Sequence, residues 1–510
     1  MVRSIGTLSS ALCALLFCAG CWRSGFENFG ADACCALADA GLEDRRILDQ
    51  VRRDAWSTDR AAGDAWSADR TAGADARPID TGVAHDSGTT APLVTRIDIG
   101  NNHTCALAAN GRVKCWGSNA LGQLGLGDTF NRGDGANEMG QALPEVALGV
   151  DTVVGTIAVG DDHACVLDRG WVKCWGDNHN GQLGLGDVAN RGDQPNEMGA
   201  ALPAVALTGT SNVLVVGSDH SCELDLGGAV RCWGDNNYGQ LGLGDLANRG
   251  DNAGEMGAQL PALDLGAAVT SELIAAGCDH TCALTAAGLK CWGSNLYGQL
   301  GLGDTNNRGD APGEMGVTLP AVSLAGGLTV DAFALGCAHT CAIVHDAYSR
   351  ASLRCWGHNQ DGQLGLGDTL DRGDQAGEVG VTLPAVALGA NRYPVALAAG
   401  GDSTCAVLDN GQVKCWGSNA YGRLGLGDTQ LRGDQPGTMG DTLPATDLAT
   451  SAGTGTIQIA ASGHLCALLV PGVVKCWGYN AFGQLGLGDS SDRGDSAGEM
   501  GVALPAVPLW

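Results

Sequence analysis

Two short segments of alternating polarity, joined by a glycine-containing turn, give the first structural prediction. Cys105–Leu107 precedes Gly111, and Val113–Trp116 follows it. Side chains on a strand point alternately to opposite faces, so this pattern is typical of an antiparallel β-hairpin. The glycine-rich stretch Gly122–Asp128 predicts a tight loop whose two leucines enter the core. Leu143–Leu148 predicts a further short strand with a proline at its edge.

This unit occurs seven times along the chain. The cysteine of its Cys-Trp-Gly motif recurs about every 60 residues, at positions 115, 174, 232, 291, 355, 415 and 476. One such unit alone leaves a strand edge and an apolar face uncovered, and closing the units into a ring covers both. The sequence therefore predicts an all-β fold, a seven-bladed β-propeller over residues 94–510. The 81 glycines suit its many tight turns, because glycine adopts positive φ without steric cost.

The N-terminal region has the character of an export signal followed by a tether. Arg3 precedes an apolar run, Leu8–Phe17, that is too short to span a bilayer. The run ends in Cys18–Cys21, which resembles the bacterial lipobox, although leucine is usual where Cys18 stands. We expect a signal peptide over residues 1–20 and lipidation of Cys21; an ordinary cleaved signal is the alternative. Residues 21–93 are rich in Ala, Asp and Arg, which predicts a low-complexity tether.

Charge narrows the choice of partners. The formal net charge is -27, and most of it falls within residues 94–510. Such a surface repels phosphate backbones, so we expect no nucleic-acid partner. The acidity serves solubility or attracts a basic partner. We expect a monomer that contacts the membrane only through its N-terminal lipid, as an outer-membrane or cell-surface lipoprotein of a bacterium.

The repeat resembles a known family. Its consensus runs through His103–Leu107, Gly111–Gly117 and Asn119–Gly125, and it resembles the repeat of the regulator of chromosome condensation family. The resemblance implies a seven-bladed propeller whose ring is closed by strands from both chain ends. It also implies protein binding, as in an exchange factor for a nuclear GTPase and a secreted bacterial inhibitor of β-lactamases. The chain lacks the wedge and basic tail of the exchange factor, so the secreted bacterial branch is the closer analogy.

The cysteines of the repeats predict structural bridges. Each repeat has one cysteine on either hairpin arm, and facing residues of antiparallel strands lie within disulfide range. The predicted pairs are Cys105/Cys115, Cys165/Cys174, Cys222/Cys232, Cys282/Cys291, Cys341/Cys355, Cys405/Cys415 and Cys466/Cys476. Cys278 and Cys337 occupy the same extra position in adjacent repeats, which predicts one bridge between blades. Zinc sites would need two more ligands at each pair, so we expect no metal and no cofactor.

Two further repeated motifs are interpreted as architecture. A histidine stands two residues before the first arm cysteine in six repeats, at positions 103, 163, 220, 280, 339 and 464, and Ser403 replaces it in the sixth. By the family resemblance each histidine is expected to bond a turn of its own blade; a metal ring is the alternative. Arg-Gly-Asp recurs in all seven repeats, and we expect its arginine to pair with an acid such as Asp128 or Asp134. Calcium binding by these loops is the other interpretation.

The positions at which the copies differ are the functional candidates. The residue before Gly-Gln-Leu, which is Gly-Arg-Leu in the sixth copy, varies, and we select its apolar and aromatic members together with the long hairpin turn of repeat five: Leu121, Tyr238, Tyr297, Tyr348, Tyr421 and Phe482. Exposed aromatic side chains anchor proteins or sugar rings, although they also cover the loops beneath them. No catalytic residues are predicted, so we expect a non-enzymatic protein-binding scaffold. A carbohydrate or cell-envelope binding module is the alternative, and a propeller enzyme is a third.

Overall fold

A computed structural model describes residues 92–150, 152–266, 270–324, 326–450 and 455–510. The predicted signal peptide, the lipidation site Cys21 and the tether up to residue 91 lie outside the described residues. Within the described part of the chain, no helix is both long enough and apolar enough to cross a membrane.

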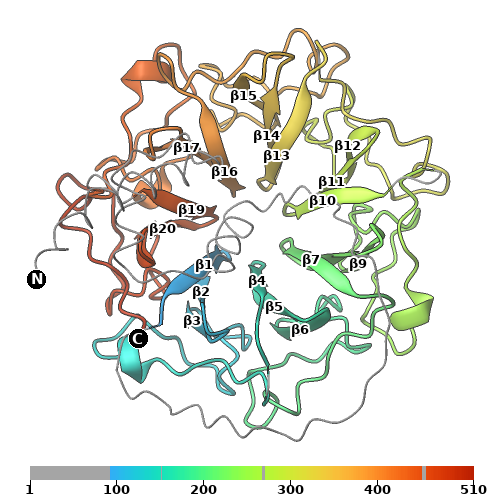
Figure 1. Cartoon of the computed structure of the whole chain (residues 1–510), viewed down its shortest axis with the longest axis vertical. Helices are drawn as coiled ribbons and strands as arrows, with labels where there is room; N and C mark the ends of the chain where they lie inside the picture. The colour runs from blue at the N-terminus through green and yellow to red at the C-terminus, as the bar shows by residue number, and fades with distance from the viewer. Residues whose placement is uncertain (1–91, 151, 267–269, 325, 451–454) are drawn as a thin grey trace, which may run out of the picture.

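Seven three-stranded antiparallel sheets stand around a central axis (Figure 1), and we number them blades 1 to 7 in chain order. The strands of blades 1 to 7 are, in turn, β1 (Val94–Ile99), β2 (His103–Ala108) and β3 (Val113–Gly117); β4 (Thr156–Val159), β5 (His163–Asp168) and β6 (Trp171–Gly176); β7 (Ser211–Val216), β8 (His220–Asp225) and β9 (Val230–Gly234); β10 (Ser271–Ala276), β11 (His280–Thr285) and β12 (Gly288–Gly293); β13 (Thr329–Leu335), β14 (His339–His345) and β15 (Ala351–Gly357); β16 (Pro394–Gly400), β17 (Ser403–Leu408) and β18 (Val413–Gly417); and β19 (Thr456–Ala461), β20 (His464–Leu469) and β21 (Val473–Gly478). The first strand of each blade is innermost in Figure 1. The predicted seven-bladed propeller is confirmed.

Short 3₁₀ turns interrupt some of the connections outside the sheets. They are η1 (Gly140–Ala142), η2 (Gly257–Gln259), η3 (Ala420–Gly422) and η4 (Gly440–Thr442). The segment Leu143–Leu148 is extended but is not a strand, and Val146 donates a single backbone hydrogen bond to Val113 (2.9 Å). The predicted fourth strand is therefore wrong. Pro144 has no amide proton to add to a ladder, so one bond at Val146 stands in place of a strand pairing.

The core lies between the blades rather than within one of them. The middle strand β2 is buried along its whole length, because a neighbouring blade covers each face of its sheet. Trp175 of blade 2 packs against Leu107, Val113 and Leu124 of blade 1. Its indole Nε1 donates to the Gln123 carbonyl of that blade (3.0 Å), and six further Cys-Trp-Gly tryptophans make the same bond to the preceding blade. Each of these loops after Trp-Gly thus joins its own blade to the next.

Blade 7 meets blade 1 through these same contacts. Trp116 donates to the Gln484 carbonyl (2.9 Å), and Lys114 Nζ donates to the carbonyl of Leu509 near the C-terminus (2.6 Å). Gln458 of β19 bonds both the amide and the carbonyl of Ile97 on β1. In the described residues every sheet uses three consecutive strands, so the expected closure by strands from both ends within one blade is wrong. Side chains and the C-terminal segment close the ring instead.

The Arg-Gly-Asp loops are internally paired. Arg132 Nη2 lies 2.7 Å from Asp128 Oδ2, and all seven loops repeat this ion pair at the same distance. Asp128 is therefore the partner, as one of the two acids expected. Glu138 accepts hydrogen bonds from the amides of Gly133 and Gly135 (both 2.9 Å). Across the described ranges, no group of three or more His, Cys, Asp or Glu side chains could hold a metal ion.

Candidate protein-binding face

The two ends of the propeller differ in what they carry. In each blade the turn between the first and second strands lies at one end, and the loop after Trp-Gly returns to it, as the bond from the Ser118 amide to the Asn102 carbonyl shows (2.8 Å). We call this end the mouth face. The hairpin turn between the second and third strands lies at the opposite end, because the strands are antiparallel, and we call that end the hairpin face.

Carboxylates gather on one part of the mouth face. Blades 2, 3 and 4 place six aspartates around the axis there, which we call the acidic sector: Asp161, Asp162, Asp177, Asp219, Asp235 and Asp279. They come from the first turn of all three blades and from the residue after Trp-Gly in blades 2 and 3. The same positions in the other blades hold mostly Asn, Ser, Ala, Gly, His or Tyr, with Asp402 as the exception. The acidic sector therefore breaks the symmetry of the ring.

Burial, with repulsion between neighbours, raises the pKa of three of these carboxyls well above the usual range. Partial burial, followed by the charges of Asp161 and Asp177, raises the pKa of Asp219 to about 7. Burial and neighbouring aspartates likewise raise the pKa of Asp162 and the pKa of Asp279 to about 6. Asp177 already has partners, since Gln182 Nε2 donates to its Oδ2 (2.9 Å) and His179 Nδ1 contacts its Oδ1, whereas no cationic side chain contacts Asp162, Asp219 or Asp279 among the described residues. A cationic partner would relieve this repulsion, because an opposite charge favours the ionised form of a carboxylate.

Aromatic rings occupy another part of the mouth face. Tyr421 packs against Tyr479 in a tilted arrangement with ring centroids 4.6 Å apart, and Tyr479 and Phe482 form a T-shaped pair at 6.2 Å. We call these three residues the aromatic sector. Arg423 lies beside it, and the charges of Asp402 and Asp361 face its guanidinium. Burial lowers the pKa of Arg423, with these acids opposing the shift, so a half-buried cation adjoins the aromatic sector.

The six partner-binding candidates do not share one environment. Tyr238 and Tyr421 are 44% and 48% exposed on the mouth face, whereas Leu121, Tyr297 and Phe482 are half-buried there. Tyr297 covers His358 of the next blade with ring centroids 4.1 Å apart. Tyr348 is 81% exposed, but it lies in the β14–β15 turn on the hairpin face. Five candidates thus share a face with the acidic sector, and one does not.

The acidic sector was not among the residues selected from the sequence. Its members come from different repeats about 60 residues apart, and only the ring brings them together. The available signal was the residue just before the repeated histidine, which is Asp162, Asp219 and Asp279 in the second, third and fourth copies. A comparison of that position across copies, rather than of the Gly-Gln-Leu loop alone, would have found it.

The cysteines pair within and between blades. The seven arm pairs have Cα atoms 4.1 Å apart and form the disulfides Cys105–Cys115, Cys165–Cys174, Cys222–Cys232, Cys282–Cys291, Cys341–Cys355, Cys405–Cys415 and Cys466–Cys476. Cys278 and Cys337 join blades 4 and 5, with Cα atoms 4.4 Å apart. Their turns lie on the mouth face, and Asp279 of the acidic sector follows Cys278 directly.

The repeated histidines join neighbouring blades. His220 Nε2 lies 2.9 Å from Thr281 Oγ1 of blade 4, and that hydroxyl donates to the Gln240 carbonyl (3.0 Å). His163, His280, His339 and His464 reach a hydroxyl of the next blade in the same way. The expectation that each histidine bonds a turn of its own blade is therefore wrong for these side chains. Burial lowers the histidine pKa values to about 3 or 4, which keeps the rings neutral.

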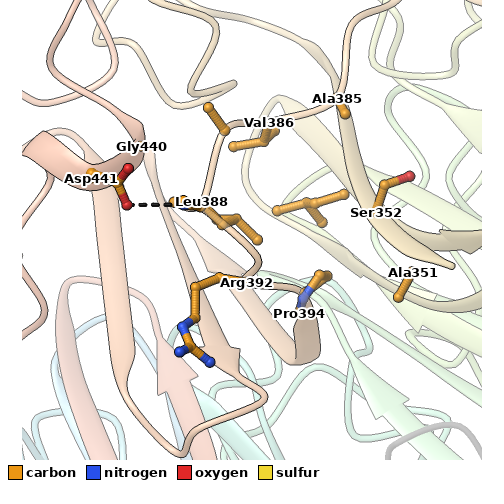
Figure 2. Close-up of a pocket in the computed structure, with 13 residues that line it drawn as sticks. Ala351, Ser352, Ala385, Val386, Leu388, Arg392, Pro394, Gly440 and Asp441 are labelled. Carbon is orange, nitrogen blue, oxygen red and sulfur yellow. Dashed lines mark hydrogen bonds between the residues drawn. The ribbon is translucent and has the colours of Figure 1, made fainter.

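One cavity opens between blades 5 and 6 near the hairpin face (Figure 2). Its volume is about 450 Å³, and Leu353, Val386 and Pro394 form much of its apolar wall. Two charged side chains line it, and both already have partners. Asp441 Oδ1 accepts a hydrogen bond from the Ala390 amide (2.9 Å), and Arg392 pairs with Asp409 (2.6 Å). These charged side chains are thus already paired with the protein itself, and the mouth face is the stronger candidate.

Two models of one repeat match the chain, both described as the regulator of chromosome condensation (RCC1) repeat. One matches residues 94–123, 156–182, 214–240, 272–299 and 395–423, and the other matches residues 110–167, 291–343 and 353–408. Together they cover about half of the chain, and every matched segment lies within the propeller.

Among curated proteins, the chain is similar to the ultraviolet-B receptor UVR8 of Arabidopsis thaliana. The two are 29% identical over 416 residues, which is 81% of this chain and 83% of the receptor. The probable E3 ubiquitin-protein ligase HERC6 of Homo sapiens is 30% identical over 59% of this chain, but the match spans only 26% of the ligase. Protein pim1 of Schizosaccharomyces pombe is 28% identical, with coverage of 66% of this chain and 61% of pim1.

Solved structures share the fold at low sequence identity. Human WBSCR16 aligns with a TM-score of 0.55 and 20% identity, over 75% of this chain and 87% of the other. Prp20p of Saccharomyces cerevisiae aligns with a TM-score of 0.51 and 22% identity, over 73% and 81%. The repeat matches and the shared ring of blades agree, and the chain belongs to the RCC1 repeat family.

Proposed function

We propose that this chain is an exported, lipid-anchored propeller at the cell surface of a bacterium, where its mouth face binds a protein partner. The observation that carries the proposal is the asymmetry of that face. Six carboxylates gather on blades 2 to 4, and aromatic rings gather on blades 6 and 7. Such a difference between the blades of a ring of similar repeats fits a partner that docks in one orientation.

The chemistry of the face defines the partner. In the acidic sector, burial and repulsion by neighbouring aspartates raise the pKa values of Asp162, Asp219 and Asp279, so the ionised forms of these carboxyls lack a compensating positive charge within the described part of the chain. Lysine or arginine side chains would relieve that repulsion and would be steered towards it. Tyr421 and Phe482 of the aromatic sector would contact an apolar or aromatic side chain of the same partner. The expected partner is therefore a protein segment that carries basic residues next to an aromatic or aliphatic anchor.

Related proteins make protein binding a reasonable expectation. The solved structure of Prp20p is described together with its binding to Gsp1p and histones, and a second solved structure shows Kap60 bound to yeast RCC1. Those partners belong to those proteins. The proposal for this chain rests on its own mouth face, which differs from blade to blade.

The path of the chain supports the proposed anchor. Leu93, just before β1, accepts a hydrogen bond from the Ala109 amide in the β2–β3 turn (2.8 Å). Leu93 and the start of β1 therefore lie at the hairpin face, opposite the acidic sector. A lipid on Cys21 would hold the propeller at that end and leave the mouth face directed away from the membrane.

Peptide selection tests the binding proposal even though the partner is unidentified. A random peptide display library is selected on the immobilised chain, and the expected winners combine Lys or Arg with an aromatic residue. Replacing Asp162, Asp219 and Asp279 together by Asn should weaken their binding at least about tenfold, and added salt should weaken it further. Tyr348→Ala on the hairpin face is the matched control and should leave binding unchanged.

Two outcomes would redirect the proposal. Peptides that bind the triple Asn variant as well as the native chain would contradict binding at the acidic sector. If the selection yields none and a glycan array yields sugars whose binding requires Tyr238 or Tyr421, the face is a carbohydrate module instead. Anchoring is tested separately in a bacterial host: Cys21→Ser should move the chain out of the membrane fraction, whereas Cys18→Ser should not.

A further inference from the structure

The disulfide between blades 4 and 5 differs from the other bridges in its accessibility. The fourteen arm cysteines expose no surface. Cys278 and Cys337 are both partly exposed, in the turns between β10 and β11 and between β13 and β14 on the mouth face. A thiol can attack a disulfide only where it can reach a sulfur atom, so this bridge is the one open to exchange among the described cysteines.

We call the contact between two adjacent blades a seam. The seam between blades 4 and 5 has the same kinds of hydrogen bond as most other seams. His280 Nε2 lies 3.0 Å from Thr340 Oγ1, and Trp356 donates to the Gln299 carbonyl (3.0 Å). The seam between blades 3 and 4 has the same two kinds of contact and no disulfide in the described residues. Because the seam between blades 3 and 4 forms without a disulfide, the seam between blades 4 and 5 does not depend on its bridge. The ring of blades can therefore stay closed when the bridge is reduced.

We propose that Cys278–Cys337 is a site of thiol–disulfide exchange, with neutral or cationic thiols as its co-reactants. A thiolate attacks one sulfur of the bridge, a new mixed S–S bond forms, and the other cysteine leaves as a thiolate. A second equivalent of the thiol attacks the mixed disulfide, so the chain is left with two thiols and the reagent with one disulfide. The two electrons that reduce the bridge come from the two reagent thiols.

The acidic sector determines which thiols react. Asp279 follows Cys278 directly, and the charges of Asp235 and Asp161 act on the same carboxyl. These negative charges repel an anionic reagent and attract a cationic one near the sulfur atoms. Because Asp279 belongs to the proposed binding face, opening the bridge would also free its turn and change the affinity for the partner; this last step rests on the proposed function.

The exchange is measured on the full chain under native conditions at pH 8. Cysteamine, 2-mercaptoethanol and 2-mercaptoethanesulfonate carry positive, neutral and negative charge, and each rate is divided by the rate of the same thiol with a small neutral disulfide. Iodoacetamide then traps free thiols, and peptide mass spectrometry locates them. Alkylation is expected at Cys278 and Cys337 well before any arm cysteine, and cysteamine should exceed the sulfonate about tenfold at low salt.

Two matched variants separate electrostatics from access. Asp279→Asn should reduce the preference for cysteamine at least about threefold, whereas Glu272→Gln, at the hairpin-face end of the same strand β10, should not change it. Alkylation of the arm cysteines together with Cys278 and Cys337, or of neither set before unfolding, would overturn the exchange site. Equal normalised rates for the three thiols at low salt would overturn the assigned class of co-reactant. A failure of peptide binding alone would leave this chemistry intact.

Discussion

The hydrogen bonds between His220, Thr281 and Gln240 provide the sharpest test of how the blades are joined. The Thr281 hydroxyl donates to the Gln240 carbonyl at 3.0 Å, so it accepts a hydrogen bond from the Nε2–H of His220 at 2.9 Å. Thr281→Val keeps the shape of the side chain and removes only this hydroxyl. The Gln240 carbonyl retains its bond from Trp292 (3.0 Å), but the buried Nε2–H loses its acceptor.

An orphaned buried donor costs about 1–3 kcal/mol, so Thr281→Val should lower the free energy of unfolding by that amount. The measurement is equilibrium unfolding in guanidinium chloride with the disulfides intact, followed by tryptophan fluorescence. Thr270→Val on the exposed surface is the control, expected within about 0.5 kcal/mol of the native chain. A Thr281→Val variant as stable as the control would refute the account of the seams.

In blade 1, a buried histidine lacks the hydroxyl acceptor that the next blade provides elsewhere in the ring. His103 faces Ala164 where other blades present a hydroxyl, and its Nε2 has no partner among the described residues. Ala164→Thr supplies the missing acceptor and should raise the free energy of unfolding by about 1 kcal/mol. Blade 6 has no histidine at this position. Ser403 stands there instead, next to Leu465 of blade 7, whose side chain could not accept a hydrogen bond.

The charges and the ring closure give three further predictions. Asp219 has a native pKa near 7 against 3.8 when unfolded, so the native state binds its proton more tightly and stability from this group falls as pH rises from about 4 to 7. Asp219→Asn should therefore be more stable than the native chain at pH 8, by roughly 1 kcal/mol after solvent screening, and equal to it at pH 4, as urea midpoints will show. The buried histidines have the opposite sign: their native pKa values of about 3 to 4 lie below 6.5, so the stability that they contribute is full above pH 6.5 and is lost as pH falls below it. Because the aspartates act in the opposite direction over the same pH range, the histidines are followed by NMR, and imidazole resonances of the folded chain that titrate near pH 6.5 would contradict their burial as neutral rings. Gln458→Ala leaves the Ile97 amide and carbonyl without their side-chain partner and should cost about 2 kcal/mol and speed hydrogen exchange in β1 before other inner strands.

Features confined to one repeat could be predicted from the sequence. The arm cysteines, the glycine turn and the strand alternation all lie within about 15 residues, and the hairpin geometry follows from their spacing alone. The bridge between Cys278 and Cys337 could be predicted too, because equivalent positions of adjacent repeats meet once the repeats form a ring. The partner Asp128 of Arg132 lies four residues away, which again is a local relation.

Features that depend on the neighbouring blade were predicted less well. The direction of a histidine ring cannot be derived from its own repeat, so the sequence places His220 against its own blade although its acceptor, Thr281, lies 61 positions later. The prediction of a fourth strand was wrong for a related reason. Whether Leu143–Leu148 pairs with the sheet depends on how the outer edge of that sheet is covered. The acidic sector needs three blades at once, and its carboxylates meet only at the axis.

Hydrogen exchange of the chain with and without a selected basic peptide tests the central claim most directly. If the mouth face is the binding face, the peptide will slow exchange in the first turns of blades 2 to 4, around Asp162, Asp219 and Asp279. The hairpin turns around Trp171 and Tyr348 will exchange at the same rate in both samples. Protection confined to those hairpin turns, or spread equally over all seven blades, would contradict the claim.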